Sequence, residues 1–403
     1  MLIDTKQRKP SISAYFKTLG IKDFKSRRGF WKHVTGVDSV LTEELEPLIS
    51  RKKQGNLYDV KNSTLPFSLA VESWTKSFHQ SFLTWINRQN QLKPKRILEI
   101  GCDNGLLACW YATRFPDSEI VGIDQSSNGI RCAKELAKQL GLANVSFYRL
   151  DFMDLRERFL MNPFDLIISV RTFHEIMGPL FIPKYWSLPD YLKENPAHGD
   201  SLYLQIVDEL LTEDGTYLSC ERFENPADVG KWANSLKLAN LHVQWDDCNI
   251  IDYHELGATK RSPIIVATKR ETGITTIEGL EHLYTKDHPL VLEAGKSYSG
   301  AKAEFAYHRL GEKTIKSGHS LDVPSHWYVF RFEIWETSSF LLVYSYGNMG
   351  HRHLDILPVG ANDDAQMLME EAMGQYSHLG PIVKYDRLEE RAISYLMPNV
   401  DVN

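Results

Sequence analysis

The sequence predicts an α/β protein with a doubly wound, mostly parallel sheet. A helical N-terminal segment precedes this sheet, and a smaller α+β domain with an antiparallel sheet follows it. Two observations predict the central part: short apolar segments alternate with helical stretches over residues 93–272, and a turn containing glycines follows the first of these segments. A change to strongly alternating strands after about residue 273 predicts the last part.

Length and composition favour a multidomain soluble protein. The chain has 403 residues, too many for one ordinary core, with 43% apolar and 24% charged residues. We therefore expect a helical cap at 1–92, an α/β domain at 93–272 and an α+β domain at 273–403. The net charge of −6 gives no overall positive field and disfavours a nucleic-acid partner. The five cysteines form no C-x-x-C pair, and neither a signal peptide nor a membrane-spanning stretch is evident, which favours the cytoplasm.

Residues 1–92 are expected to be mostly helical. Over 69–86 an aromatic or aliphatic side chain recurs every four residues, which predicts one helix with an apolar stripe: Trp74, Phe78, Phe82 and Ile86. We expect this stripe to pack the segment onto the next domain. Residues 1–34 are basic, and they either contact an anionic partner or form a solvated helix face.

The central region alternates between strand and helix patterns. Strands are expected at 96–100, 119–124, 145–150, 164–169 and 215–220, and two more at 241–245 and 264–268 complete the sheet. Ser126 is a candidate N-cap for a helix that Gly141 can end.

The last region reads as an antiparallel sheet covered on one face by a helix. Alternation over 328–335 places Tyr328, Phe330, Phe332 and Ile334 on one face, and 340–346 pairs with this strand across a short turn. A strand at 353–357 and a helix at 363–376 follow. His351 and His353 point the same way on a strand, but no third ligand is evident, so we predict no metal site.

The segment 97–105 carries most of the chemical information. A strand runs into a turn where Gly101 allows the backbone to approach a ligand and Gly105 lets a helix begin beside it. Glu99 lies near the end of this strand, where a carboxylate suits a cationic ligand. Asp124 ends the second strand about twenty residues later, where a carboxylate can accept both ribose hydroxyls. Dinucleotide sites share that second acid but normally need a G-x-G-x-x-G pattern, which is absent here.

With this pattern, the stretch 93–270 resembles the class I S-adenosylmethionine-dependent methyltransferase family. Residues 98–105 match its first motif, 121–124 its second, 150–152 its third, and 164–169 followed by His174 its fourth. The resemblance implies a Rossmann-like fold and S-adenosyl-L-methionine as cofactor, with S-adenosyl-L-homocysteine as product. The acceptor would be a small molecule or a peptide.

The resemblance also implies the residues that bind the cofactor. They are Glu99, Gly101, Asp103, Gly105, Asp124, Gln125, Asp151, Phe152, Ser169 and Arg171. The two glycines would surround the methionine and ribose portions, the aspartate ending the second strand would hold the ribose, and Asp151 with Phe152 would flank the adenine. Ser169 and Arg171 would lie beside the sulfonium. Asp103 departs from the family, which often has glycine there, and its side chain could narrow the pocket.

Candidate catalytic residues follow the fourth strand. His174 and Glu175 lie where the crevice is expected and are candidates for the base, although His174 could instead anchor the loop. The next segment, 178–191, is rich in aromatic residues and prolines. Phe181, Tyr185 and Trp186 are candidate substrate contacts, or else part of a packed loop.

Three functions remain open from the sequence. The first is methyl transfer to an oxygen or nitrogen of a small molecule or natural-product intermediate, favoured by the aromatic segment and the acidic composition. The second is a protein or peptide methyltransferase that recruits its substrate through the last domain. The third is a cofactor-binding interaction module without turnover, encouraged only by Asp103. The absence of an Asn-Pro-Pro-Tyr type sequence and of a Pro-Cys nucleophile disfavours methylation of DNA bases.

Overall fold

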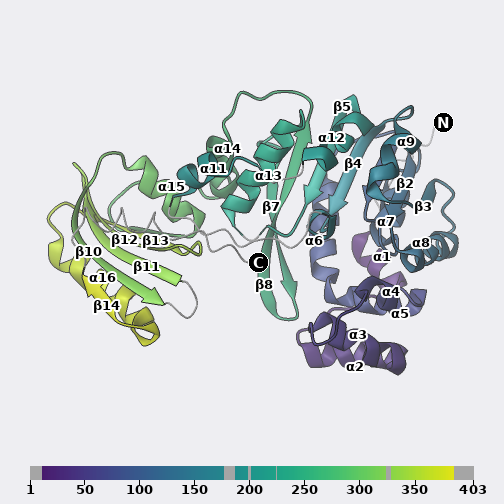
Figure 1. The fold of residues 1–403 in the computed structure, drawn as a ribbon, viewed down its shortest axis with the longest axis horizontal. Helices are drawn as coiled ribbons and strands as arrows, with labels where there is room; N and C mark the ends of the chain where they lie inside the picture. Colours follow the sequence, from purple (N-terminus) through teal and green to yellow (C-terminus); the bar gives the residue numbers. More distant parts are fainter. Residues whose placement is uncertain (1–10, 177–186, 198–200, 224, 324–327, 385–403) are drawn as a thin grey trace, which may run out of the picture. The chain divides into compact units, whose positions relative to one another are not determined.

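The computed structural model forms two compact units, which we describe one at a time (Figure 1). The structure describes residues 11–176, 187–197, 201–223, 225–323 and 328–384. Within these residues, the first unit comprises 11–176, 201–223 and 233–273, and the second comprises 187–197, 225–232, 274–323 and 328–384. The three-part division expected from the sequence remains a prediction.

The first unit begins with helices, as predicted. They are α1 (Ile12–Thr18), α2 (Arg27–Val37), α3 (Ser39–Ile49), α4 (Leu57–Lys61), α5 (Leu65–Val71) and α6 (Lys76–Arg88). The single helix predicted over 69–86 is wrong, because the 3₁₀ turn η1 (Glu72–Trp74) separates α5 from α6. At Thr75 the backbone leaves helical geometry, with φ −105° and ψ 7°. The apolar stripe is nevertheless real, since Phe78, Phe82 and Ile86 are buried on α6.

A mostly parallel sheet forms the centre of the first unit, which confirms the predicted fold class. Its strand order is β3-β2-β1-β4-β5-β8-β6, and neighbours from β3 through β5 are parallel. The first four strands are β1 (Arg96–Ile100), β2 (Glu119–Asp124), β3 (Val145–Arg149) and β4 (Phe164–Val170). Because β1 lies between β2 and β4, their carboxyl ends meet at one edge of the sheet, where ligands of such folds bind.

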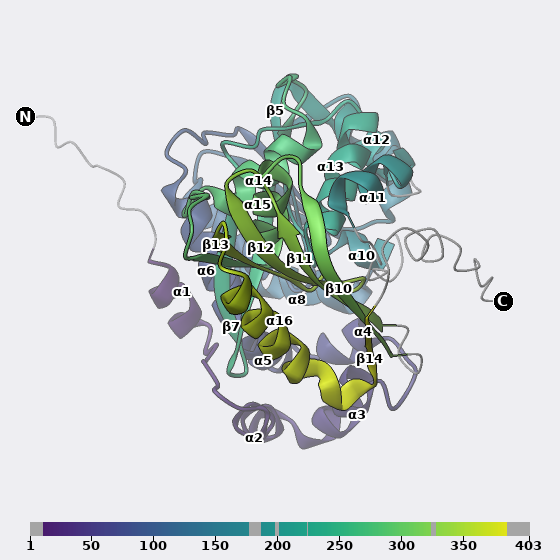
Figure 2. The same cartoon turned by 90° about the vertical axis from the view of Figure 1, so that its left-hand side faces the viewer.

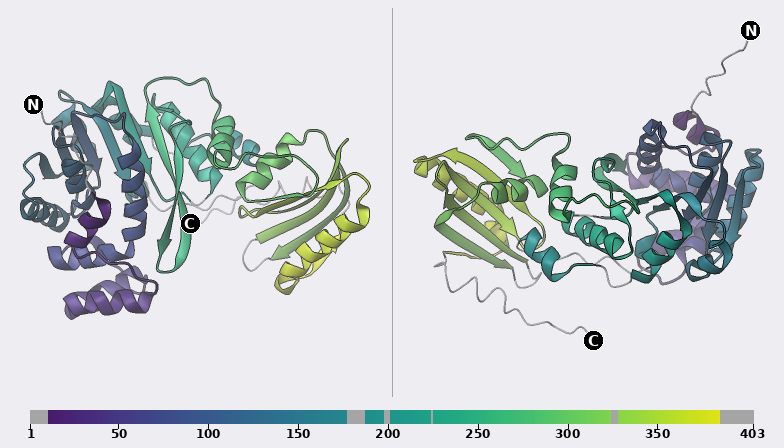
Figure 3. Two further views of the ribbon diagram at one scale, coloured as in Figure 1. Left: turned by 180° about the vertical axis from the view of Figure 1, so that it is seen from behind. Right: turned by 90° about the horizontal axis from the view of Figure 1, so that it is seen from above.

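The other edge of this sheet is antiparallel. It consists of β5 (Leu211–Cys220), β6 (His242–Val243), β7 (Asn249–Glu255) and β8 (Ala258–Thr268). The hairpin of β7 and β8, which the sequence interpretation missed, extends past the other strands and runs beside α6 (Figure 3). Ser81 Oγ donates to the Asp252 carbonyl at 2.8 Å, and His254 N donates to Ser77 Oγ at 3.0 Å. Phe78, a residue of the apolar stripe, also lies edge-on to Tyr253 of β7 with ring centroids 5.1 Å apart, so α6 contacts this hairpin through both polar and apolar side chains.

Helices connect the strands. They are α7 (Leu106–Arg114), α8 (Ser127–Gln139), α9 (Leu155–Phe159), α10 (Phe173–Ile176) and α12 (Ser201–Leu210), with a 3₁₀ turn η2 (Phe152–Asp154) before α9. Helix α13 (Pro226–Leu238) follows β5 in the chain, and its residues are divided between the two units. Ser126 caps α8 by accepting from Gly129 N, and Gly141 follows the helix with φ 66°, as predicted. Among the helices that the structure describes, none is long and apolar enough to cross a membrane.

The second unit contains an antiparallel sheet in the order β14-β10-β11-β12-β13-β9. Its strands are β9 (Lys296–Ser299), β10 (Thr314–Val323), β11 (Tyr328–Glu336), β12 (Phe340–Gly347), β13 (Arg352–Pro358) and β14 (Ile382–Lys384). The predicted pairing of β11 with β12 is confirmed, with Ile334 opposite Val343. Its helices are α11 (Leu188–Glu194), α14 (Thr276–Thr285), α15 (Ala301–Arg309) and α16 (Asn362–Tyr376), and a 3₁₀ turn, η4 (Ser377–Leu379), follows the last.

Helices cover both faces of this second sheet, so the expectation of one covered face is wrong. Helix α16 lies across one face (Figure 2) and packs there through Ala365 and Met369. On the other face, Ala303 and Ala306 of α15 pack against a separate cluster that includes Leu342. The reason is that β12 is apolar on both of its faces, as a fully buried strand must be.

A buried ion pair joins helix α15 to strand β13 in this second unit. Glu304 of α15 is only 1% exposed, accepts a hydrogen bond from Leu188 N at 2.6 Å and contacts Arg352 Nε at 3.3 Å. The Arg352 side chain also donates to the Gly347 and His351 carbonyls. The charges are therefore compensated inside the fold.

Candidate cofactor site

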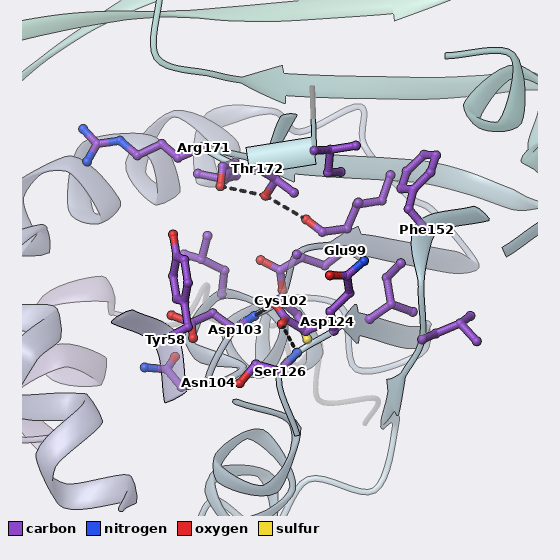
Figure 4. A pocket seen from close by; sticks show the side chains of 18 of the residues that line it. Tyr58, Glu99, Cys102, Asp103, Asn104, Asp124, Ser126, Phe152, Arg171 and Thr172 are labelled. Carbon is purple, nitrogen blue, oxygen red and sulfur yellow. Dashed lines mark hydrogen bonds between the residues drawn. The ribbon is translucent and has the colours of Figure 1, made fainter. Parts of the chain in front are cut away.

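A cavity of about 1080 Å³ opens at the carboxyl ends of β1, β2 and β4 (Figure 4). Its walls come from the loop after β1, the loop after β4 and the N-terminal helices. The lining includes Tyr58, Lys61, Glu72, Thr75, His79, Glu99, Gly101, Asp103, Asp124, Gln125, Asp151, Phe152, Arg171, Thr172, Tyr203 and Arg222. Thus most of the predicted cofactor residues meet at one cavity, whereas Gly105 and Ser169 are absent from its lining.

The loop after β1 needs its glycines for close packing. Gly101, Asp103 and Gly105 have φ of 70°, 48° and 76°, in the left-handed region. A Cβ at Gly101 would lie 2.5 Å from the Thr172 side chain. At Gly105 it would lie 2.7 Å from Ala133 Cβ. Gly105 therefore lets α7 begin close to α8, and Gly101 brings the β1 and β4 loops together.

Asp124 ends β2 and fixes the neighbouring backbone. Its Oδ2 accepts from Asp103 N at 2.9 Å, and its Oδ1 accepts from Ser126 N at 2.8 Å. Burial, together with the nearby Asp103 carboxylate, raises the pKa of Asp124 to about 6. A carboxylate has about four acceptor positions, so two backbone donors leave capacity for further donors from a ligand.

Glu99 is buried in the cavity wall with an acceptor atom unused. The residue is 2% exposed, and its Oε2 has no hydrogen-bond partner among the described residues. Burial raises the pKa of Glu99 well above its ordinary value, and Asp103 and Asp124 raise it further. The surroundings of Glu99 therefore favour the uncharged form of its carboxyl group. An unsatisfied buried acceptor of this kind suits a ligand that brings a donor.

A polar and aromatic corner forms at the end of β3. Gln125 Nε2 donates to Asp151 Oδ2 at 2.6 Å, while Asp151 Oδ1 accepts from Met153 N at 2.9 Å. The buried Phe152 ring lies edge-on to Phe173 and Tyr203, with centroids 5.8 and 5.4 Å away. The corner offers an aromatic surface and polar atoms side by side, which suits a heterocyclic base.

Arg171, in the loop after β4, is bound to the β7–β8 hairpin. Its φ is 54°, its Nη1 donates to Glu255 Oε1 at 2.7 Å, and its Nη2 donates to Tyr253 OH at 2.9 Å. The guanidinium lies 3.8 Å from the centre of the Phe78 ring. Arg171 therefore lines the cavity while joining α6, β7 and the loop after β4.

Glu221, just after β5, binds the backbone of the loop after β4. Its Oε2 accepts from Thr172 N at 2.8 Å and from Phe173 N at 3.1 Å, so it caps the start of α10. Its Oε1 accepts from Ser169 Oγ at 2.8 Å. Ser169 is fully buried in this arrangement and reaches the cavity only through the loop it supports. Sequence reasoning missed Glu221, because a single acid after a strand has no distinctive spacing.

The N-terminal helices supply residues that sequence reasoning missed. Lys61 forms ion pairs with Glu72 and Asp103, and all three line the cavity. His79 Nδ1 lies 3.5 Å from Glu72 Oε2, and burial lowers the pKa of His79 to about 4 although Glu72 opposes the shift. These positions look like ordinary polar residues of helices in the sequence, so no pattern could identify them.

Several predicted residues lie beyond what can be described. The side chains of His174 and Glu175, within α10, and the residues Phe181, Tyr185 and Trp186 lie outside the described part of the chain.

In the second unit, His353 contacts Asp355 at 3.2 Å and two serines. Over the described residues, no group of three or more His, Cys, Asp or Glu side chains is arranged to hold a metal ion.

Comparison with known proteins identifies the central region. A family model described as a methyltransferase domain matches residues 92–268. The ubiquinone biosynthesis O-methyltransferase of Dechloromonas aromatica is 25% identical over 177 residues, which cover 40% of this chain and 71% of that protein. The tRNA1(Val) (adenine(37)-N6)-methyltransferase of Yersinia enterocolitica is 27% identical over 197 residues, covering 47% and 71%. Two uncharacterized proteins, from Synechococcus sp. and Rickettsia prowazekii, match over only 25% and 20% of their own lengths.

Among solved structures, the ribosomal protein L11 methylase of Lactobacillus delbrueckii subsp. bulgaricus is 14% identical with a TM-score of 0.32, covering 48% of this chain and 78% of that one. The match to the family model and to the methyltransferase relatives identifies residues 92–268 as a class I S-adenosylmethionine-dependent methyltransferase domain, as the resemblance predicted. The relatives act on small molecules, tRNA and rRNA, so they do not support the expectation that a nucleic acid is disfavoured.

The site fits the family's cofactor. S-adenosylmethionine carries an amino group, two ribose hydroxyls and an adenine ring. The unused Oε2 of Glu99 suits the amino group, Asp124 has acceptor capacity for the hydroxyls, and the corner at Phe152 offers a surface for the adenine. The cavity, at about 1080 Å³, is large enough for such a ligand.

Proposed function

We propose that this chain is a methyltransferase that uses S-adenosylmethionine to methylate an oxygen or nitrogen of a small molecule or natural-product intermediate. The observation that carries the proposal is the cavity at the carboxyl ends of β1, β2 and β4, in which Glu99 keeps an unused buried acceptor beside Asp124. When bound, the cofactor supplies a methyl group attached to positively charged sulfur. The protein's task is then to align the acceptor, exclude water and remove a proton where the acceptor needs it.

Each predicted cofactor residue has a role in this proposal. Asp124 holds the ribose, Gln125, Asp151 and Phe152 hold the adenine, and Glu99 with the loop 101–105 holds the methionine portion. Arg171 shapes the wall near the sulfur. Gly105 and Ser169 act indirectly, since the first allows the close start of α7 and the second supports Glu221.

The acceptor side is formed by the loop after β4 and the N-terminal helices. We propose His174 or Glu175 as the proton acceptor, and Phe181, Tyr185 and Trp186 as contacts to the acceptor. Tyr58 and Thr75 line the cavity on the side of the N-terminal helices. A cavity of about 1080 Å³ suits a small acceptor, or a single side chain or base that enters alone.

Two other acceptor classes have support of their own. Curated relatives include tRNA and rRNA methyltransferases, and exposed basic residues occur near α2: Lys22, Lys25, Arg27, Arg28 and Lys32. Those observations favour an RNA acceptor. The second unit offers a separate fold for recruiting a peptide. A cofactor-binding module without turnover is the remaining alternative.

An acceptor panel tests these classes directly. Purified protein is incubated with S-adenosylmethionine and, in separate reactions, with a small-molecule extract, a peptide library and total RNA, and formation of S-adenosylhomocysteine is measured. The small-molecule proposal expects product in the first reaction, at a rate that Asp124→Ala lowers strongly. Product only with peptides or RNA would replace the acceptor class. No product with any class, from protein that binds the cofactor, would support the module without turnover.

A further inference from the structure

The loop that begins the cofactor site is held from outside the methyltransferase domain. Lys61, the last residue of α4, forms ion pairs with Asp103 in that loop and with Glu72 of η1. Its side chain is 11% exposed. Asn62, the next residue, donates from Nδ2 to Asp103 Oδ1 at 2.6 Å. Both oxygens of Asp103 are therefore bound by the N-terminal helical segment.

A second set of hydrogen bonds reinforces the same connection. Asn104 Nδ2 donates to Ser68 Oγ at 2.8 Å and to Glu72 Oε1 at 3.1 Å. Ser68 Oγ in turn donates to Asn62 Oδ1 at 2.6 Å. Asn104, Ser68 and Asn62 are each almost inaccessible to solvent. Two consecutive loop residues, Asp103 and Asn104, are thus joined to N-terminal residues that lie more than thirty positions earlier in the chain.

The charges at this junction depend on Lys61. Burial disfavours the ammonium, but Asp103 and Glu72 outweigh burial and raise the pKa of Lys61, so it stays charged. Burial likewise disfavours the Glu72 carboxylate, yet Lys61 and His79 lower its pKa to about 2. Without Lys61, two carboxylates would share a mostly buried site next to Asp124 with no cation between them.

The backbone of Asp103 connects the Lys61 contact to Asp124, the carboxylate proposed to hold the ribose. Asp103 has φ 48°, a conformation that glycine adopts without strain and other residues adopt reluctantly. Its N–H donates to Asp124 Oδ2 at 2.9 Å. Fixing the Asp103 side chain therefore holds a strained backbone whose N–H orients Asp124. A glycine at 103 would need no such fixing.

We propose that Lys61 is a positioning residue for cofactor binding, which acts by holding Asp103 and, through it, Asp124. The N-terminal helices are then part of the cofactor site. Lys61 binds the aspartate that this chain has at position 103, where the family often has glycine. This inference rests on the proposed function, since it assumes that the cavity binds S-adenosylmethionine.

The test is a double-mutant cycle between Lys61→Met and Asp103→Gly in the full chain, read by calorimetric titration with S-adenosylmethionine. Lys61→Met should weaken binding by about tenfold, within the range of coupling between contacting residues. In the Asp103→Gly background the same change should cost less than about threefold, because the contact no longer exists. Lys76→Met is the matched control: Lys76 also pairs with an acid, Asp23, but does not line the cavity, and its removal should leave affinity unchanged.

A second ligand separates positioning from a simple charge effect. S-adenosylhomocysteine lacks the positive sulfur, so a charge effect of Lys61→Met would favour the cationic ligand over it. Positioning predicts an equal loss for both ligands. If Lys61→Met does not fold, the double variant Lys61→Met/Glu72→Gln, which removes both buried charges, replaces it in the cycle with Asp103→Gly. Thermal unfolding of each variant verifies that it is folded.

The outcomes are distinct. A wild-type protein that binds neither ligand would overturn the proposed function itself. If the wild type binds, an unchanged affinity in Lys61→Met, an equal loss with and without Asp103, or a loss confined to one ligand would overturn the positioning role alone. A loss for both ligands that Asp103→Gly relieves supports it.

Discussion

Binding of S-adenosylmethionine should release a proton from Glu99. The number of protons released on cofactor binding is compared between the wild type and Glu99→Gln. Glu99 is 2% exposed, and burial raises its pKa well above the ordinary value, which favours the protonated form in the free protein. A cationic amino group placed against the unused Oε2 would favour the carboxylate and expel the proton.

The structure sets the size of this effect. A Glu99 carboxyl group that passes from neutral to ionised on binding releases up to about one proton per cofactor. Asp124, with its pKa raised to about 6, is about one-tenth protonated at about pH 7 and adds only about 0.1 proton. Glutamine at position 99 resembles the neutral carboxyl, so Glu99→Gln should change the stability of the free protein by less than about 1 kcal/mol.

Titration calorimetry in buffers of different ionisation enthalpy measures this proton directly. The slope of the apparent binding enthalpy against the buffer enthalpy should correspond to about one proton for the wild type, and to nearly none for Glu99→Gln. Cofactor affinity should fall in the variant. A wild-type slope near zero would refute the reasoning, because it would mean that Glu99 is already ionised or never meets the cofactor's charge.

Three further predictions follow from named contacts. Since ribose donors favour the ionised form of Asp124, this group should strengthen cofactor binding by about tenfold from about pH 5 to about pH 7, and titrations of Asp124→Asn should lack that component. Gly101→Ala should destabilise the protein by about 2–3 kcal/mol in chemical denaturation, because its methyl group would lie 2.5 Å from a threonine side chain. Gly141→Ala, with a similar φ but open space around it, should cost only about 1 kcal/mol; equal costs would contradict the clash. Arg352→Met should lower the stability of the second unit by about 3–5 kcal/mol by leaving Glu304 buried without its arginine, and an unchanged urea midpoint would argue against this.

The sequence predicted the fold where periodicity and turn chemistry agree. The strands that end at Ile100 and Asp124 are short apolar segments followed by glycine or a helix cap, and the structure contains both. The alternation from Tyr328 to Ile334 likewise predicted the face on which these side chains pack. Such features are local, so a single segment contains the information.

The sequence could not predict contacts that join distant segments. No glycine or proline marks the break at Glu72–Trp74, where the helix gives way so that Glu72 can meet Lys61. Polar residues in helices look alike whether they face solvent or a buried partner. Asp103 was recognisable as a departure from the family, but its meaning depends on Lys61, forty-two residues earlier. The sequence interpretation also missed the β7–β8 hairpin and therefore the partners of Arg171.

The central claim is that this cavity binds S-adenosylmethionine through Asp124. Calorimetric titration of the purified full chain, wild type beside Asp124→Ala, tests it most directly. The account predicts micromolar binding that the substitution weakens by about tenfold or more, equivalent to about 1.4 kcal/mol. A folded wild-type protein that binds no S-adenosylmethionine, with or without candidate acceptors, would contradict the account, as would a variant that binds as tightly as the wild type.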